Sequence, residues 1–355
     1  MPRSWPPSIR KCCCRTRRAR PRRAPGPTCA WRKAPTAIRT VSDAAGGTFQ
    51  VRFEQRWGHL THPRVRALAW LLDSPDLLDP ASPHWGGRIA SLAPVTPFVA
   101  AWLGALQDDP SPLDAALGPK FYSRLGLYAE KLLAFYFEQH GLLQAHGLQV
   151  QVNRNDTVGE FDFLLRDGVQ GDALLHWEFA TKFYLLEGAP DPGIFNHLIG
   201  PNLADTLGLK MRKILDKQLA LSRHPAAQSL LAQPVRAAQA LVKGWLFYPS
   251  GATPAMDGIS QEHGHGFWCT PAQLPARRYV VLPRLQWLAP FKGRDVEVLD
   301  VDALRAQLFD LAQPVMVATV DTIEGWEVEC TRGFVVPHDW VEQAAARRLT
   351  GTLPA

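Results

Sequence analysis

Two short segments in the middle of the chain decide its fold: Gly159-Glu160-Phe161-Asp162-Phe163-Leu164-Leu165 and His176-Trp177-Glu178-Phe179-Ala180-Thr181-Lys182. Each alternates between apolar and other residues with the period of two that is typical of a β-strand. In the first segment Glu160 and Asp162 share one face, and in the second Glu178 and Lys182 share one face. If the two strands pair as a hairpin, these charged faces lie side by side.

A helix is predicted before this strand pair, over residues 120–139. Its main apolar stripe has helical spacing and consists of Phe121, Leu125, Tyr128, Leu132 and Phe135. Glu130 lies on a second face of the helix, among apolar neighbours one turn away. Because burial of an unpaired charge is costly, we expect Glu130 to have an arginine, a backbone cap or a metal ion as its partner.

A second helix is predicted after the strand pair, over residues 202–222. Asn202 is its expected N-cap, because an asparagine side chain can accept a hydrogen bond from an amide of the first turn. Lys210 and Gln218 lie near the apolar stripe of this helix. A further strand is predicted at residues 242–248, so the sequence favours an α/β fold.

The carboxylates of this region suggest a chemistry. Carboxylates that converge repel one another, and a divalent cation is the usual remedy. A lysine beside them can hold an attacking water or offset charge on a phosphoryl oxygen. The pattern therefore predicts metal-assisted phosphodiester hydrolysis, with Mg²⁺ or Mn²⁺ as the ion. The candidate metal ligands are Asp162, Glu178, Glu130 and Glu160, and the candidate catalytic residues are Asp162, Glu178, Lys182 and Glu130. The alternative is a sheet whose polar face is solvated.

The order of these parts resembles the core of the PD-(D/E)XK nuclease superfamily over about residues 120–250. The strand segment 159–165 is especially similar to the Gly-Glu-x-Asp strand of small resolvase-like members. The resemblance implies an α-β-α core with a mixed sheet. It also implies that Asp162 is the central metal ligand, Lys182 the motif lysine and Glu130 a helical acid that assists metal binding.

The chain departs from that family pattern at one position. The superfamily has Asp or Glu two residues before the motif lysine, and this chain has Ala180. Glu178 lies on the same face but two residues, about 6–7 Å, further along the strand. Glu130 or Glu160 is the other possible source of the missing oxygen. Two alternatives to the nuclease therefore stay open. One is a catalytically degenerate nuclease fold that acts as a nucleic-acid-binding or scaffold protein, and the other is a partner-binding protein in which Glu130 and Lys182 form a buried ion pair.

Over most of residues 60–345 the chain is also similar to an uncharacterised bacterial family, domain of unknown function 1853. Three segments carry this similarity: 125–133, 159–165 and 176–185. The family has no assigned activity, so the similarity implies no function. Combined with the predicted elements, it divides the chain into a tail (1–40), a helical region (41–118), the nuclease-like core (119–250) and an α+β extension (251–355).

The charge of the chain is concentrated in the tail. Residues 1–40 contain 12 Lys and Arg and no acidic residue, which leaves 27 basic against 33 acidic residues in the remainder. The tail is interpreted as a disordered nucleic-acid-binding arm, a transit peptide, or upstream sequence read from a mis-assigned start, with Val41 near the true beginning. We favour the last. The expected partner is nucleic acid, with DNA preferred, and the sequence leaves the oligomeric state open.

Four of the six cysteines also lie in the tail, and only Cys269 and Cys330 follow it. This distribution is no disulfide framework and suits a reducing cytoplasm. No apolar run is long enough to span a membrane, so we expect a soluble cytoplasmic protein. A weaker metal hypothesis is a zinc site formed by His263, His265 and Cys269, although no fourth ligand is evident and the glycines between them indicate a loop.

Overall fold

The computed structural model describes residues 47–119, 122, 124–154, 156–167, 173–188, 194–249 and 254–350. The tail, including Val41, and Phe121 of the predicted helical stripe lie outside the described residues. None of the helices within these ranges is both long and apolar enough to cross a membrane.

A single mixed β-sheet runs through the described part of the chain, with ten strands. Its hydrogen-bonded order is β1-β2-β3-β5-β6-β10-β9-β7, with β4 beside β3 and β8 beside β10. Strands β1, β2 and β3 form an antiparallel meander, whereas β3, β5, β6 and β10 are parallel to their neighbours in that order. The strands are β1 (Leu143–Asn153), β2 (Asp156–Arg166), β3 (Leu174–Leu186), β4 (Leu198–Ile199), β5 (Val235–Pro249), β6 (Gly264–Cys269), β7 (Tyr279–Val281), β8 (Lys292–Gly293), β9 (Val315–Ile323) and β10 (Trp326–Val335). The α/β class predicted from the sequence is confirmed.

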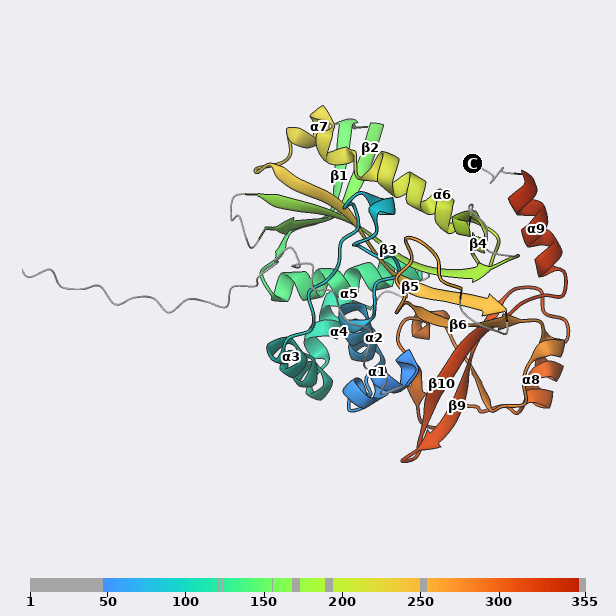
Figure 1. Ribbon diagram of the computed structural model, residues 1–355. Coiled ribbons are helices and arrows are strands. Elements are labelled where there is room, and N and C mark those ends of the chain that lie inside the picture. The colour runs from blue at the N-terminus through green and yellow to red at the C-terminus, as the bar shows by residue number, and fades with distance from the viewer. Residues whose placement is uncertain are drawn as a thin grey trace, which may run out of the picture.

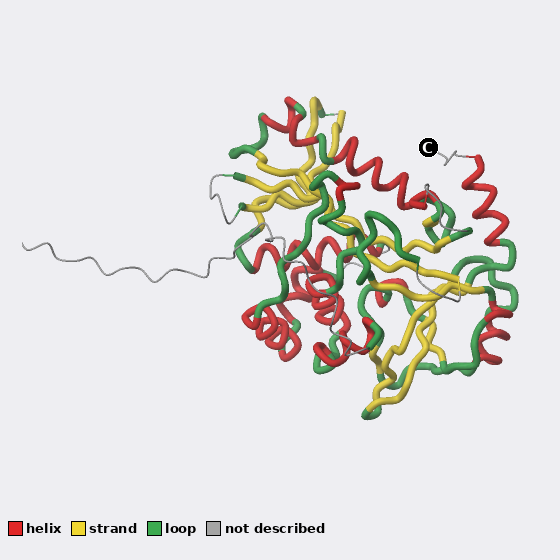
Figure 2. Tube along the Cα trace, viewed as in Figure 1, coloured by secondary structure: helices red, strands yellow, loops and turns green. Residues whose placement is uncertain are grey.

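Helices cover both faces of this sheet. Figure 1 shows α1 to α5 on one side of strands β1 to β5 and α6 with α7 on the other, and Figure 2 shows the strands running between these helical layers. The helices are α1 (Phe49–Trp57), α2 (Pro63–Asp73), α3 (Pro97–Asp108), α4 (Ser111–Leu117), α5 (Leu125–Gln139), α6 (Leu207–Arg212), α7 (Pro225–Gln228), α8 (Val301–Gln307) and α9 (Trp340–Thr350). The order α5, β1, β2, β3, α6, β5 is the order expected for the central region.

Strand β3 is buried on both faces. Trp177 and Phe179 belong to the hydrophobic core that includes α5. Ala180 and Tyr184 belong to a second core, whose other side is formed by Met211 and its neighbours after β4. The alternative of a solvated polar face is therefore wrong for β3, because the face that carries Glu178 is covered.

The helix predicted over residues 202–222 is shorter and irregular. Leu203 has a backbone φ of 57°, which no α-helix accommodates, so the chain turns there and α6 begins only at Leu207. Thr206, not Asn202, is the N-cap, because its hydroxyl accepts a hydrogen bond from the amide of Leu209 at 3.2 Å. Beyond α6 the helix widens into a π-helical turn over Lys213–Gln218.

Residues 251–355 are joined to the central region by a shared core. Arg332 of β10 is fully buried and makes a bidentate ion pair with Glu329, with both N–O distances 2.7 Å. Its guanidinium lies 4.2 Å from the ring centroid of Trp245 on β5. It also donates to the carbonyl oxygen of Ala289 at 2.6 Å. The C-terminal part therefore continues the central sheet.

The β3–β5 ladder leaves no room for a side chain at Gly244. This residue pairs with Lys182, and a Cβ atom at Gly244 would lie 1.9 Å from the Lys182 carbonyl oxygen. We expect Gly244→Ala to lower the free energy of unfolding by about 3 kcal/mol, because the two strands must separate. Gly104→Ala on α3 is the control, since its Cβ meets nothing within 4 Å. Chemical denaturation measures both, and equal stabilities would contradict this packing.

Candidate carboxylate site

Asp162 of β2 and Glu178 of β3 face each other where the two strands part. The β2–β3 ladder ends at the pair Phe163 and Trp177, so the next position brings Asp162 opposite Glu178. There a side chain takes over the role of a backbone carbonyl oxygen in the ladder: Oδ2 of Asp162 accepts a hydrogen bond from the amide of Phe179 at 2.8 Å. The charge of Glu178 raises the pKa of Asp162, as expected for two carboxyl groups that lie close together. The antiparallel register therefore brings together two carboxyl groups that lie 16 positions apart in the sequence.

Glu178 is held from both sides. Its carboxyl group has no solvent exposure, and Oε1 lies 2.8 Å from Nε2 of His176. Oε2 accepts a hydrogen bond from the side-chain amide of Gln218, at the end of the π-helical turn. Burial lowers the pKa of His176 to about 4. His176 is consequently neutral at physiological pH and donates its Nε2 proton to Glu178.

Burial changes the protonation of the carboxyl pair. It raises the pKa of Asp162 to about 7, and the nearby charge of Glu178 adds to the rise. It also raises the pKa of Glu178 to about 7, against the opposing effect of Lys210. Because the two groups interact strongly, they titrate as a pair, and the first carboxylate to form holds back the loss of the second proton.

The cation beside these carboxyl groups is Lys210 of α6. Its charge lowers the pKa of both Asp162 and Glu178. Burial lowers the pKa of Lys210 itself, and the charge of Lys182 adds to that effect. The sequence placed Lys210 and Gln218 near an apolar stripe but gave neither a role. The signal in the sequence was their position: polar side chains next to the apolar stripe of a helix pack near the buried sheet and need partners there.

Lys182, the predicted motif lysine, points to another partner. Its Nζ lies 2.8 Å from Oδ2 of Asp205, in the loop before α6. The hydroxyl of Tyr184 donates to the same oxygen at 3.2 Å. The charge of Lys182 contributes to the lowered pKa of Lys210. A row of charged groups therefore follows one face of β3, from Glu178 through Lys210 to Lys182 and Asp205.

The other predicted acids lie at different distances from this row. Glu130 of α5 accepts a hydrogen bond or ion pair from Nε2 of His146 at 2.7 Å, and its charge raises the pKa of Asp162. The hypothesis of a Glu130–Lys182 ion pair is therefore wrong. Glu160 is exposed and bonds to the side-chain amide of Gln149 at 3.3 Å. The structure brings Asp162 and Glu178 together, with Glu130 nearby and Glu160 apart.

The donor set of the pair suits a hard cation. Among the described residues no three His, Cys, Asp or Glu side chains form a ready-made metal cage. Mg²⁺ needs none, since it is commonly held by one or two carboxylates, with water and phosphate oxygens completing its shell. Gln218 adds a buried Oε1 that has no hydrogen-bond partner. Asp162, Glu178 and this amide oxygen thus fit Mg²⁺ or Mn²⁺.

The zinc hypothesis finds no such support. Both ring nitrogens of His263 are engaged, Nε2 with the hydroxyl of Tyr248 at 2.7 Å and Nδ1 with the carbonyl oxygen of Ser260 at 2.5 Å. His265 is exposed and turns its Nδ1 to the carbonyl oxygen of His263. His263, His265 and Cys269 do not converge on a metal site.

Comparison with known proteins identifies a family but no activity. No curated protein and no solved structure matches this chain significantly. The similarity to the PD-(D/E)XK nucleases thus stays a prediction. A family model described as a domain of unknown function, DUF1853, matches residues 66–336, which is most of the chain. As the segments 125–133, 159–165 and 176–185 predicted, the chain belongs to the DUF1853 family.

Proposed function

We propose that this protein hydrolyses phosphodiester bonds of nucleic acid with the help of a divalent cation. The observation that carries the proposal is the buried Asp162–Glu178 pair on adjacent strands, with Lys210 beside it. The nuclease pattern has an acid at the position of Ala180, and this chain lacks it. The register of β2 and β3 sets Glu178 opposite Asp162, so Glu178 can supply the second carboxylate in its place. The element order α5, β1, β2, β3, α6, β5 supports the same reading.

Each side chain has a part in this proposal. Asp162 and Glu178 would hold Mg²⁺ or Mn²⁺, which supplies charge neutralisation and an activated nucleophile when bound. His176 and Gln218 fix the Glu178 carboxylate, and the amide of Phe179 fixes Asp162. Lys210 would offset the negative charge that develops on the phosphate in the transition state. DNA is the proposed substrate.

A second candidate is a catalytically degenerate nuclease fold that binds nucleic acid or acts as a scaffold. It is favoured by the engagement of Lys182 with Asp205 and by the complete burial of Glu178. In that case the carboxyl pair would be a structural feature, and nucleic-acid binding would not depend on a divalent cation. The two candidate functions differ in one respect: only the nuclease requires Asp162 and Glu178 both for metal binding and for cleavage.

We expect Asp162→Asn and Glu178→Gln each to reduce cleavage by about a hundredfold or more, because each removes a charge that the proposed metal ion requires. The assay presents single-stranded, duplex and branched DNA and RNA with Mg²⁺ or Mn²⁺. Glu160→Gln is the matched control and should cleave like the wild type, since Glu160 is exposed and bonds only to Gln149 among the contacts described here. Cleavage that survives both site substitutions would refute the catalytic proposal.

The raised pKa values also predict a pH-dependent stability. The ordinary pKa values are 3.8 for Asp162 and 4.5 for Glu178, and both rise to about 7 in the folded protein. The folded state therefore binds these protons more tightly, so their stabilising contribution is complete at low pH and is lost between about pH 4 and pH 7. We expect Glu178→Gln to shrink the difference in melting temperature between pH 5 and pH 8 by about 4 °C.

A divalent cation should restore the stability that the folded protein loses when Asp162 and Glu178 are deprotonated. At pH 8 the melting temperature of the wild type should rise with Mg²⁺ or Mn²⁺, whereas that of Glu178→Gln should not, because the variant lacks one of the two carboxylates. Gln218 can turn its amide to fit the new side chain, since its Oε1 is unpartnered. Equal pH and metal responses in both proteins would favour the degenerate fold.

A further inference from the structure

A small cavity lies at the Lys182 end of the charged row. It has a volume of about 190 Å³, and Lys182 and Asp205 form one side of it. Arg284, Trp287 and Leu125 at the start of α5 also line it. This Lys182 cavity is distinct from the carboxyl pair. Lys182 shares a strand face with Glu178, whereas Thr181 and Phe183, which also line the cavity, lie on the other face of β3.

Arg284 brings an uncommitted positive charge to this cavity. Its side chain is exposed. Within the described part of the chain, its guanidinium contacts only the ring of Trp287, with 5.4 Å between the guanidinium carbon and the ring centroid. A guanidinium without a carboxylate partner retains its donors for an incoming phosphate. With Lys182 and Asp205 as the other charged groups of the wall, the cavity carries a net positive charge.

The Lys182–Asp205 ion pair is also open to exchange. The Lys182 side chain is 26% exposed and the Asp205 side chain 34% exposed. Ion pairs that water can reach are weak, so a phosphate that also contacts Arg284 can compete with Asp205 for Lys182.

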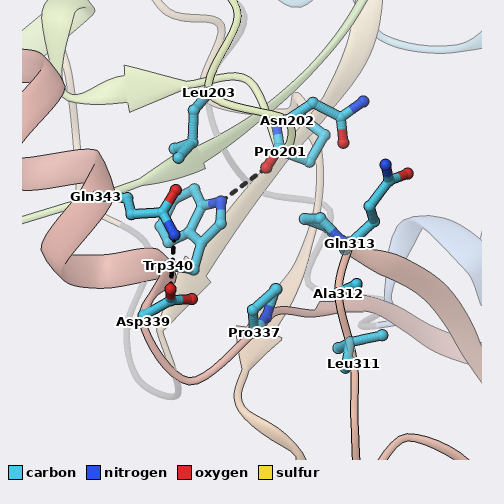
Figure 3. A pocket seen from close by; sticks show the side chains of 11 residues that line it. Pro201, Asn202, Leu203, Leu311, Ala312, Gln313, Pro337, Asp339, Trp340 and Gln343 are labelled. Atoms are coloured by element: carbon cyan, nitrogen blue, oxygen red, sulfur yellow. Dashed lines mark hydrogen bonds between the residues drawn. The ribbon is translucent and has the colours of Figure 1, made fainter.

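The loop that forms the rim of the cavity is fixed by a hydrogen bond from α9. Residues 200–205 form this rim, and on their far side lies a second cavity of about 310 Å³ (Figure 3). There the indole Nε1 of Trp340 donates to the carbonyl oxygen of Pro201 at 2.7 Å. This hydrogen bond and that from the Leu203 amide to the Gly200 carbonyl oxygen fix the loop around the left-handed Leu203. The Lys182 cavity is therefore preformed, as binding sites generally are.

Trp287 adds a surface for a base or sugar. Its ring is half-buried, with Phe183 packed against it edge to face at 5.7 Å and its indole N–H bonded to the Leu282 carbonyl oxygen at 3.0 Å. Aromatic rings of this kind stack on bases without regard to sequence. The cavity is smaller than the roughly 300–1,000 Å³ of typical ligand pockets, so it suits one phosphate with part of its nucleotide.

We propose that the Lys182 cavity binds a phosphate that neighbours the scissile phosphate of a single nucleic-acid strand, with Arg284 and Lys182 as its ligands. This inference rests on the proposed nuclease function, because it places the strand along the charged row of β3. Arg284 is a positioning residue, and the Trp287 ring beside it favours an unpaired strand, whose bases are free to stack on an aromatic surface.

The test measures binding separately from cleavage. Anisotropy of a labelled single-stranded oligonucleotide in EDTA gives the affinity at several salt concentrations, with DNA and RNA versions and a matching duplex. We expect Arg284→Ala to weaken single-strand binding about tenfold. We also expect it to lower the slope of log affinity against log salt by about 0.7, the value for one phosphate contact on a single strand. The duplex should bind more weakly and respond less to the substitution.

The matched control is Arg294→Ala. Arg294 likewise lies on a tryptophan, 4.1 Å from the ring centroid of Trp326, but beside the β9–β10 hairpin. Its removal should change neither affinity nor slope, and Arg284→Lys should retain most of the slope. If the wild type cleaves in Mg²⁺ while Arg284→Ala binds with unchanged affinity and slope, the cavity assignment is overturned and the nuclease stands. If the wild type neither binds nor cleaves, both fall.

Discussion

Strand β3 is enclosed on both faces around Glu178, and this enclosure is the constraint on which the structure depends. The core with α5 takes one face and the core with α6 takes the other. Strand β5 pairs along one edge, and β2 and β4 pair with the two ends of the other edge. A strand in that position must satisfy every polar group without water. Glu178 lies on this strand, so the fold has to supply its partners, and it does so with His176 and Gln218.

The irregular features around the site follow from that need. A regular α-helix after Lys213 would carry its side chains past β3 at a different phase, and the π-helical turn that ends at Gln218 sets this amide against Glu178. Such turns are frequent at functional sites because they re-aim a side chain. Asp162 meets the same need in β2, where its carboxylate accepts the Phe179 amide at the point where the ladder stops.

The local parts of this arrangement could be predicted from the sequence, and the distant ones could not. Alternation identified β2 and β3, and pairing them as a hairpin correctly put Asp162 beside Glu178, because the register of a hairpin depends on residues close in the chain. The sequence did not predict the partner of Lys182, which is Asp205. Asp205 reaches Lys182 through the left-handed turn at Leu203, and no sequence pattern predicts a positive φ at a leucine. The true N-cap Thr206 was missed for the same reason.

The cost of the carboxyl pair bears on the choice between an active and a degenerate nuclease. Two buried acids with one half-buried lysine near them are not stabilised as an apolar pair of the same size would be. Near neutral pH the charge on Asp162 and Glu178 is removed either by a proton or by a cation, and the two compete for the same oxygens. A purely structural pair gains most by keeping its proton, which a stronger apolar surrounding would ensure. Here Lys210 lowers both pKa values toward neutrality. In the proposed function, a divalent cation would displace the proton from this pair near neutral pH, which is the condition that metal-assisted hydrolysis requires.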